Sequence, residues 1–268
     1  MFELFLVTVF GAIFGSYATL FAYRLPLNES IFGRYFGPKS RCPNCSSIIK
    51  TRDLIPLINW LITFGKCRNC NIEIPRIHLF VELFTIAGFI LSYLSFGFNE
   101  SFILNAIFIT CLVIITATDY SHQVFPFQIL CLMSTLAVAI RTIQDQSINN
   151  IIFNVAFSTI LISLLWKIIK VKIDKKDKRI TTIFTKINLN KQQFFDYIKL
   201  ILIASLILPL ISFILYFAIS IIAIFSLQFI RIMFKKFYPK NKERNINYKY
   251  SPGYIFTFTL LIFLIIKI

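Results

Sequence analysis

Long apolar stretches alternate with short polar ones along most of the chain. A helix needs about 20 mostly apolar residues to cross a membrane, and eight stretches approach this length. They are residues 4–23, 79–97, 102–118, 124–142, 150–168, 196–213, 214–232 and 252–268. The stretch from Phe194 to Phe234 is too long for one span, and Pro209 near its middle predicts a break. The pattern predicts an all-α polytopic membrane protein with about eight transmembrane helices.

Composition supports lipid as the solvent of this chain. Of 268 residues, 57% are hydrophobic and 16% aromatic, which is more apolar surface than a soluble domain of this length can bury. The 28 Lys and Arg residues outnumber the 12 Asp and Glu residues. In a soluble protein this excess would suggest nucleic-acid binding, whereas in a membrane protein it first reports topology.

The basic residues gather in three segments. Residues 24–78, 167–193 and 231–250 hold 25 of the 28 Lys and Arg residues, whereas the loops near 98–101 and 144–150 hold none. Eight spans with the N-terminus outside place all three basic segments in the cytoplasm, facing anionic lipid headgroups. This explains the charge, so we expect membrane lipids and not nucleic acid as partners.

The start of the chain is interpreted as a retained span and not as a signal peptide, because it lacks a basic beginning and carries Glu3. The predicted organisation is therefore a first helix at 1–24, a cytoplasmic cysteine domain at 25–78 and a membrane domain at 79–268. The loops 167–193 and 231–250 belong to the membrane domain.

Two C-x-x-C pairs lie in the first basic segment, separated by 21 residues. They are Cys42–Cys45 and Cys67–Cys70. Two such pairs can place four thiolates tetrahedrally around Zn²⁺, as in a zinc ribbon, and four ligands leave no open position for catalysis. The sequence thus predicts a structural zinc; iron or redox chemistry and unligated thiols are the alternatives.

Two aspartates are expected at one membrane face. Asp119 follows the third span and Asp196 begins the sixth, and the predicted topology puts both on the cytoplasmic side. Ionisable residues at membrane depth are costly and therefore mark functional sites. Two close carboxylates can share a proton, activate water and protonate a leaving amide, which is aspartyl proteolysis. The structural alternative is that each aspartate caps the helix after it. Glu82 is expected to pair with a basic residue such as Arg24 or Arg76.

Several segments together resemble the type IV prepilin peptidase family. The first span and its exit, GAIFGSYATLFAYRLP, are similar to the segment that opens these enzymes. The stretch SRCPNCSSIIKTRDLIPLINWLITFGKCRNCNIEIPRIHLFVELFT is similar to their cysteine domain, and TDYSHQVFP keeps the spacing from the first catalytic aspartate to a proline. The resemblance covers residues 8–130 well, and the second half mainly by hydropathy.

The resemblance implies an aspartyl endopeptidase of the bacterial inner membrane. Such an enzyme removes leaders from prepilin or pseudopilin helices at the cytoplasmic membrane face, with Asp119 as its first catalytic residue. Many members also methylate the new N-terminus with S-adenosylmethionine, so methyl transfer is expected here too, although no glycine-rich cofactor loop marks it.

The second half departs from the family pattern. The second catalytic aspartate of the family lies in Gly-x-Gly-Asp and is followed two residues later by Lys-Leu. This chain has QQFFDYIKL, which lacks both glycines and puts Asp196 three residues before Lys199. Asp196 remains the best match by topology, ahead of Asp174 and Asp177 in the Lys-rich loop. The alternatives are a catalytically weak relative that binds pilin helices as an assembly factor, and a small-solute transporter, which would need more polar residues or broken helices within the spans.

Overall fold

The structure, a computed structural model, describes most of the first half of the chain and part of the second. The described residues are 1–31, 39–144, 149–160, 163, 191–220, 222–223, 257 and 259–260, without the side chains of 51–52 and 191–195. Within these residues the chain is helical and has no strand, apart from two isolated bridges between single residues. The predicted all-α fold class is confirmed.

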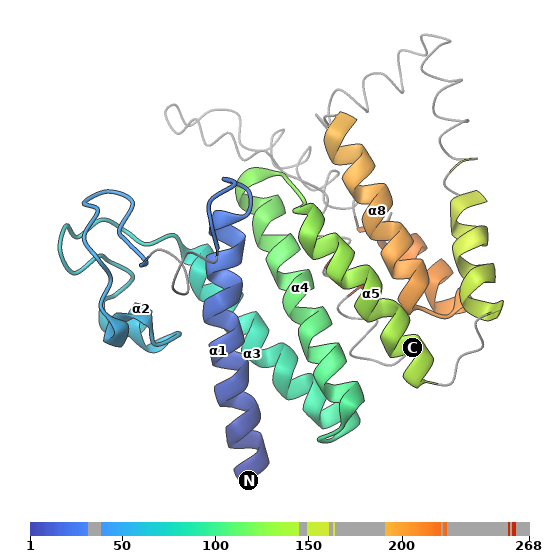
Figure 1. The fold of residues 1–268 in the computed structure, drawn as a ribbon, viewed down its shortest axis with the longest axis horizontal. Helices are drawn as coiled ribbons and strands as arrows, with labels where there is room; N and C mark the ends of the chain where they lie inside the picture. The colour runs from blue at the N-terminus through green and yellow to red at the C-terminus, as the bar shows by residue number, and fades with distance from the viewer. Residues whose placement is uncertain are drawn as a thin grey trace, which may run out of the picture. The chain divides into compact units, whose positions relative to one another are not determined.

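The chain divides into two compact units, Met1–Leu136 and Ala137–Ile268. The first unit contains α1 (Phe2–Arg24), the 3₁₀ helix η1 (Thr51–Leu54), α2 (Ile58–Ile62), α3 (Arg76–Phe96) and α4 (Glu100–His122). Helix α5 (Phe127–Ile143) begins in the first unit and ends in the second, which also contains α8 (Lys191–Ile207) and the helix Leu210–Ser220. Figure 1 shows these elements.

Three described helices, α1, α3 and α4, are long and apolar enough to cross a membrane. They correspond to the predicted spans 4–23, 79–97 and 102–118. Helix α5 overlaps the fourth predicted span, and residues 149–160 form a helix where the fifth begins.

The predicted break near Pro209 is present, but its position differs from the expected boundary between 213 and 214. Helix α8 ends at Ile207, and the next helix starts at Leu210. The break lies at the proline because proline has no N–H to donate and its ring clashes with the preceding turn. Most of the predicted eighth span lies outside the described residues, as do nearly all of the basic loops 167–193 and 231–250.

Helices α1 and α3 pack closely because two glycines of α1 face α3. A Cβ on Gly11 would lie 3.0 Å from Ile86 Cα, and one on Gly15 would lie 3.1 Å from Glu82 Cα. Small residues four apart allow helix backbones to approach in this way inside membranes. The hydroxyl of Tyr93 donates to Glu3 Oε2 at 2.6 Å and thereby ties the C-terminal end of α3 to the N-terminal end of α1. The two helices are therefore antiparallel.

Helix α4 returns beside α3 after a short turn, and it begins where the Asn99 side chain accepts a hydrogen bond from the N–H of Phe102. The aromatic rings of Phe89 and Phe102 meet edge to face, with centroids 6.2 Å apart, in a cluster that also includes Val7 and Ala106. This packing fixes α1, α3 and α4 as a bundle in which α1 and α4 end at the same side (Figure 1).

The second unit buries several polar contacts. Arg141 Nη2 and Asn154 Nδ2 each donate to the carbonyl oxygen of Leu208 at 3.3 Å, at the break before Pro209. A further bond of 2.9 Å joins the hydroxyls of Ser158 and Ser205. The break is thus satisfied by protein groups, as non-helical backbone in a membrane must be.

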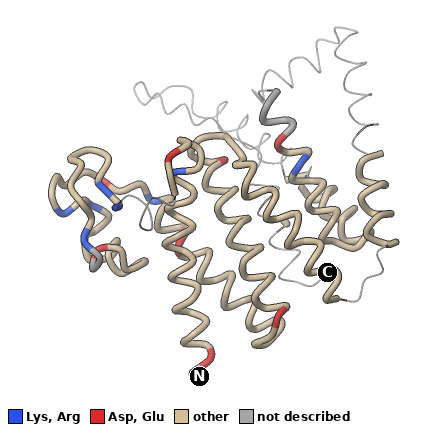
Figure 2. The backbone as a smooth tube through the Cα atoms, in the orientation of Figure 1, with Lys and Arg blue, Asp and Glu red and all other residues tan. Residues whose placement is uncertain are grey.

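Charged residues are sparse along the apolar helices. Within the first unit, Figure 2 shows the described Lys and Arg residues concentrated at one end of the helices and in the cysteine-containing segment, whereas Lys199 of the second unit lies within α8. This distribution agrees with helices that lie in a membrane.

Candidate functional site

The four predicted zinc ligands come together. The Sγ atoms of Cys42, Cys45, Cys67 and Cys70 all lie within 4.8 Å of one another, and those of Cys42 and Cys70 are 3.7 Å apart. A zinc ion with Zn–S bonds of about 2.3 Å separates tetrahedral sulfurs by about 3.8 Å. All four thiols are free of disulfides. The donor set and its spacing therefore fit a four-coordinate structural zinc.

The two C-x-x-C loops have the same backbone conformation. In each loop the N–H of the first cysteine donates to a carbonyl five residues later, Ser47 for Cys42 and Ile72 for Cys67. In each loop the residue after the second cysteine has a positive φ, 56° at Ser46 and 57° at Asn71. This left-handed residue returns the chain so that both sulfurs point to one side.

The surroundings of the thiols favour thiolates at two of the four positions. Hydrogen bonds from the side chains of Ser47 and Asn69 and from the Ser47 backbone lower the pKa of Cys45 to about 6. The backbone amides of Cys70 and Asn69 lower the pKa of Cys67. At Cys42 two backbone amides stabilise the thiolate, but burial and the neighbouring thiols raise its pKa overall. Lowered thiol pKa values are characteristic of cysteines that bind metal.

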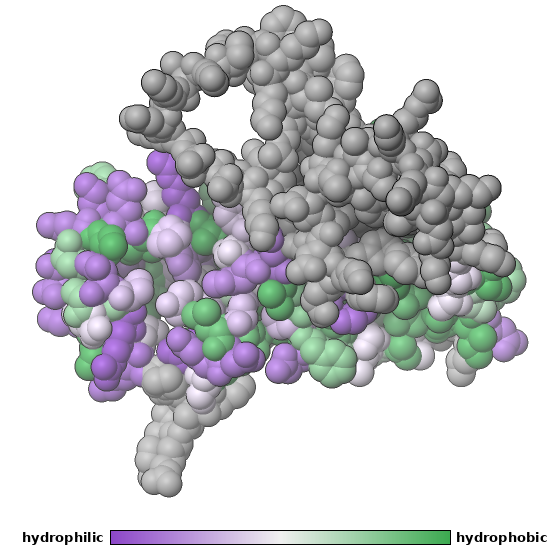
Figure 3. Space-filling model, turned by 90° about the horizontal axis from the view of Figure 1, so that it is seen from above, coloured by the Kyte–Doolittle hydropathy of each residue, from purple (hydrophilic) through white to green (hydrophobic). Residues whose placement is uncertain are grey.

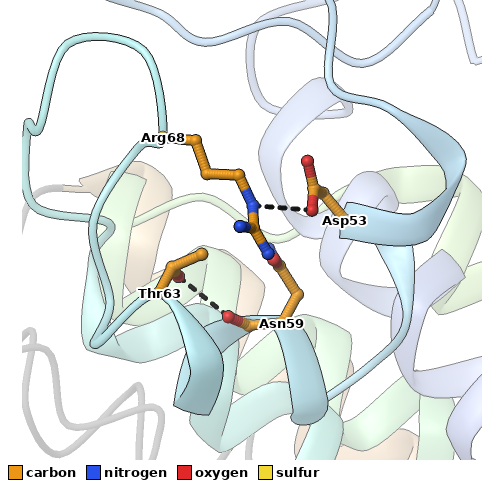
Figure 4. A network of polar contacts seen from close by, with 4 residues as sticks. All are labelled: Asp53, Asn59, Thr63 and Arg68. Atoms are coloured by element: carbon orange, nitrogen blue, oxygen red, sulfur yellow. Dashed lines mark hydrogen bonds and ion pairs between the residues drawn. The ribbon is translucent and has the colours of Figure 1, made fainter.

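An ion pair connects η1 to the second C-x-x-C loop, and a separate hydrogen bond closes the C-terminal end of α2. Arg68 Nε and Asp53 Oδ1 form an ion pair at 2.8 Å, and the Thr63 hydroxyl donates to the carbonyl oxygen of Asn59 at 2.8 Å (Figure 4). We call the described residues 39–75, which contain both loops, η1 and α2, the cysteine domain.

Glu82 joins the cysteine domain to α3. Its Oε2 atom accepts a hydrogen bond of 2.8 Å from the backbone N–H of Leu57. The expected partner was a basic side chain such as Arg24 or Arg76, and this expectation is wrong. Leu57 has φ 59° and ψ −48°, and the N–H of Ile58 donates to the carbonyl of Pro56 at 2.6 Å. These features define a γ-turn of the rare, strained type, so the Glu82 carboxylate holds a strained backbone in place.

Asp119 lies inside α4 and not after it. The helix continues to His122 and closes at Gln123, whose φ of 57° is left-handed and whose N–H donates to the Asp119 carbonyl at 3.0 Å. Helix α5 begins only at Phe127, so Asp119 does not cap it. Asp119 is 1% exposed. Asp119 is thus a buried ionisable residue near the negative end of the α4 helix dipole.

Asp196 also lies within a helix. Helix α8 begins at Lys191, five residues earlier, which excludes the predicted alternative that Asp196 is its cap. Asp196 is 2% exposed, and its Oδ1 atom forms an ion pair of 2.9 Å with Lys199 Nζ, one helical turn further on. Asp119 belongs to the first unit and Asp196 to the second.

Residues 9–96 match a family model described as the bacterial peptidase A24 N-terminal domain. A prepilin leader peptidase/N-methyltransferase of Bacillus subtilis (strain 168) is 31% identical over 136 residues, which are 51% of this chain and 53% of that relative. The resemblance to the type IV prepilin peptidase family is confirmed.

Two further relatives agree. A type 4 prepilin-like proteins leader peptide-processing enzyme of Escherichia coli O78:H11 is 30% identical, over 45% of this chain and 50% of that relative. A prepilin leader peptidase/N-methyltransferase of Vibrio cholerae is 33% identical, over 39% of this chain and 44% of the relative. The chain thus matches about half the length of these prepilin peptidases, or less. No solved structure matches the chain.

The match to the A24 N-terminal domain covers α1 from residue 9, the cysteine domain and α3, while Asp119 and Asp196 lie beyond it. The one-residue shift of Asp196 relative to the prepilin peptidase pattern has a structural consequence. Residues two apart on a helix point in different directions, whereas residues three apart lie on one face. The spacing in this chain therefore allows the Asp196–Lys199 ion pair.

Two features of this region were not predicted from the sequence. The bond between Glu82 and the Leu57 N–H depends on a γ-turn that no sequence pattern predicts. The buried side chain of Arg141, 1% exposed, lies where a basic residue near the end of a span would be expected to reach solvent.

Proposed function

We propose that the chain is an aspartyl endopeptidase of the bacterial inner membrane that cleaves leaders from prepilin-like proteins, with Asp119 and Asp196 as its catalytic acids. The observation that carries the proposal is the place of Asp119. Its carboxyl is buried in the last turn of α4, at the same end of the bundle where α1 leads into the cysteine domain. An ionisable residue buried at the end of a membrane-spanning helix is a functional candidate.

The reaction is hydrolysis of one peptide bond. One carboxylate accepts a proton from water as the water oxygen attacks the scissile carbonyl, and the other carboxyl donates a proton to the leaving nitrogen. The C–N bond breaks, and the products are a carboxylate on the leader and an amine on the mature helix. The distribution of the basic segments favours the cytoplasmic face for this chemistry, with the N-terminus of the enzyme outside.

Zinc on the four cysteines is structural in this proposal, because four thiolates complete the coordination shell. We further propose that the new N-terminus is methylated, as the names of the relatives imply for those proteins. S-adenosylmethionine would supply the methyl group. The substrates are prepilin or pseudopilin helices, which approach through the surrounding lipid.

The test is cleavage of a co-expressed prepilin by the full chain, read by mass spectrometry of the mature N-terminus, which also reports methylation. We expect the wild type to cut and both Asp119→Asn and Asp196→Asn to lose about 10²–10⁴-fold in rate. Glu100→Gln, at the opposite end of α4, is the matched carboxylate control and keeps activity. Full activity in Asp196→Asn would mean that another residue is the second acid.

The Asp196–Lys199 ion pair favours a second candidate, a catalytically weak relative that binds pilin helices. A carboxylate whose Oδ1 atom is held by a lysine at 2.9 Å is less available to bind the attacking water. Purified protein that retains a prepilin through extraction and affinity purification but never cuts it would favour this reading over the peptidase.

A further inference from the structure

Of the eight large apolar side chains exposed on the cysteine domain, the four most exposed gather in and just after α2. Ile58, Leu61 and Ile62 of α2 are 52%, 61% and 60% exposed, and Phe64 just after α2 is 85% exposed. We call these four residues the α2 patch. Exposed apolar residues gathered in one short segment mark an interaction surface.

The hydrogen bond to Glu82 sets the depth of this patch. Leu57, the residue before α2, is bonded to Glu82, and Glu82 lies six residues after the start of α3 at Arg76. Six residues of helix correspond to about 9 Å along its axis. Helix α2 is therefore held beside the body of a membrane-spanning helix, and Figure 1 shows it level with α1, between the two ends of that helix.

The rest of the cysteine domain has a basic charge balance, and its other exposed apolar residues, Ile48, Leu54, Ile55 and Ile72, are each less exposed than those of the α2 patch. Residues 39–75 contain six Lys or Arg residues against Asp53 and Glu73. Seen from the side on which α1 and α4 end, the cysteine domain presents mainly hydrophilic residues (Figure 3). An apolar segment at membrane depth beneath a basic surface is the arrangement of an interfacial anchor on anionic lipids.

We propose that the α2 patch inserts into the bilayer at the membrane face from which the cysteine domain emerges, so that this domain lies partly in lipid. The strained γ-turn at Leu57 and the Glu82 bond direct α2 toward the bilayer. The proposal does not depend on the peptidase activity.

The test measures the depth of position 64 in the full chain. Phe64→Trp is made, and the protein is reconstituted in nanodiscs of zwitterionic and anionic phospholipids brominated on their acyl chains. The emission of the parent protein, which has two native tryptophans, is subtracted. The matched control is Ile48→Trp, because Ile48 is an apolar residue of the first C-x-x-C loop and is 51% exposed.

We expect brominated lipid to remove about half of the emission added at position 64, as for a residue in the acyl region, and to leave the emission added at position 48 nearly unchanged. Absence of quenching at both positions overturns the proposal. Equal quenching at both overturns the assignment to α2, because the whole domain would then lie in lipid. If a pilin-like peptide relieves the quenching at position 64, the patch binds peptide and the proposal fails.

Discussion

The cysteine domain and the bundle of α1, α3 and α4 are neighbours in the chain, but different forces hold them together. Helix α4 buries 14 of its 23 residues. Among the described side chains of residues 39–75, by contrast, Cys42 is the one buried hydrophobic residue. The bundle is stabilised by packing, whereas the cysteine domain has too little core to fold without its metal ligands. We therefore expect these adjoining regions to unfold under different perturbations.

The largest expected effect is loss of the metal. Cys67→Ser removes one of four thiolates, and structural zinc sites contribute apparent binding free energies of about 10–16 kcal/mol. We expect bound zinc, measured by elemental analysis of purified protein, to fall to background and residues 39–75 to become sensitive to protease. The bundle is expected to remain folded. Cys131→Ser, an exposed cysteine of α5, is the control and should retain zinc. Cooperative unfolding of the bundle after zinc loss would show that the bundle depends on the zinc site for its stability.

The converse perturbation is a methyl group between α3 and α4. A Cβ on Gly88 would lie 2.4 Å from Ile109 Cγ2, so Gly88→Ala should destabilise the bundle by about 1–3 kcal/mol through overpacking. Thermal unfolding in detergent measures the change, and the zinc content should not alter. The double variant Gly88→Ala with Ile109→Ala removes the obstructing methyl and should recover part of the loss. Purely additive effects would show that the two residues do not meet.

A smaller effect is expected where the two regions join. Glu82→Gln replaces a charged acceptor for the Leu57 N–H and should weaken this bond by about 1–2 kcal/mol. We expect about tenfold faster hydrogen exchange in peptides covering α2, with zinc retained and the bundle unchanged. Glu100→Gln provides the control. Unchanged exchange in α2 would mean that the zinc site alone fixes this helix.

The smallest effect belongs to Lys199. Its side chain is 43% exposed, and partly exposed ion pairs contribute about 0.2–1 kcal/mol. Lys199→Met should therefore barely change the unfolding temperature, and its consequence should appear in the rate of prepilin cleavage. Lys199→Arg keeps the charge and should behave as the wild type. A large loss of stability would identify the pair as a structural contact of α8.

The apolar helices and the cysteine cluster could be predicted from the sequence. Hydropathy located the apolar helices, and the spacing of four cysteines predicted a cluster that the structure contains, because both signals are local. The ends of the helices were less accessible. Helix α4 continues past Asp119 because nothing before Gln123 stops it, and the break in the second unit follows Pro209 and not the midpoint of the apolar stretch.

Two other contacts between distant residues could not be predicted. Glu82 was expected to pair with a basic side chain, because charged side chains can be read from the sequence and backbone donors with positive φ cannot. It binds a backbone N–H instead, because the γ-turn at Leu57 brings that donor to the surface of α3. The buried position of Arg141 likewise depends on a carbonyl 67 residues further along the chain.

The broken helix of the second unit has a consequence for the order of biosynthesis. The Leu208 carbonyl, left without a helical donor in hydrocarbon, would cost several kcal/mol. Both of its donors are translated first, since Arg141 and Asn154 precede Leu208 by 67 and 54 residues. At about 5–20 residues per second, the ribosome gives Asn154 roughly 3–10 s to enter the membrane before Leu208 emerges. The donors of Arg141 and Asn154 are therefore available in the membrane when the Leu208 carbonyl enters it.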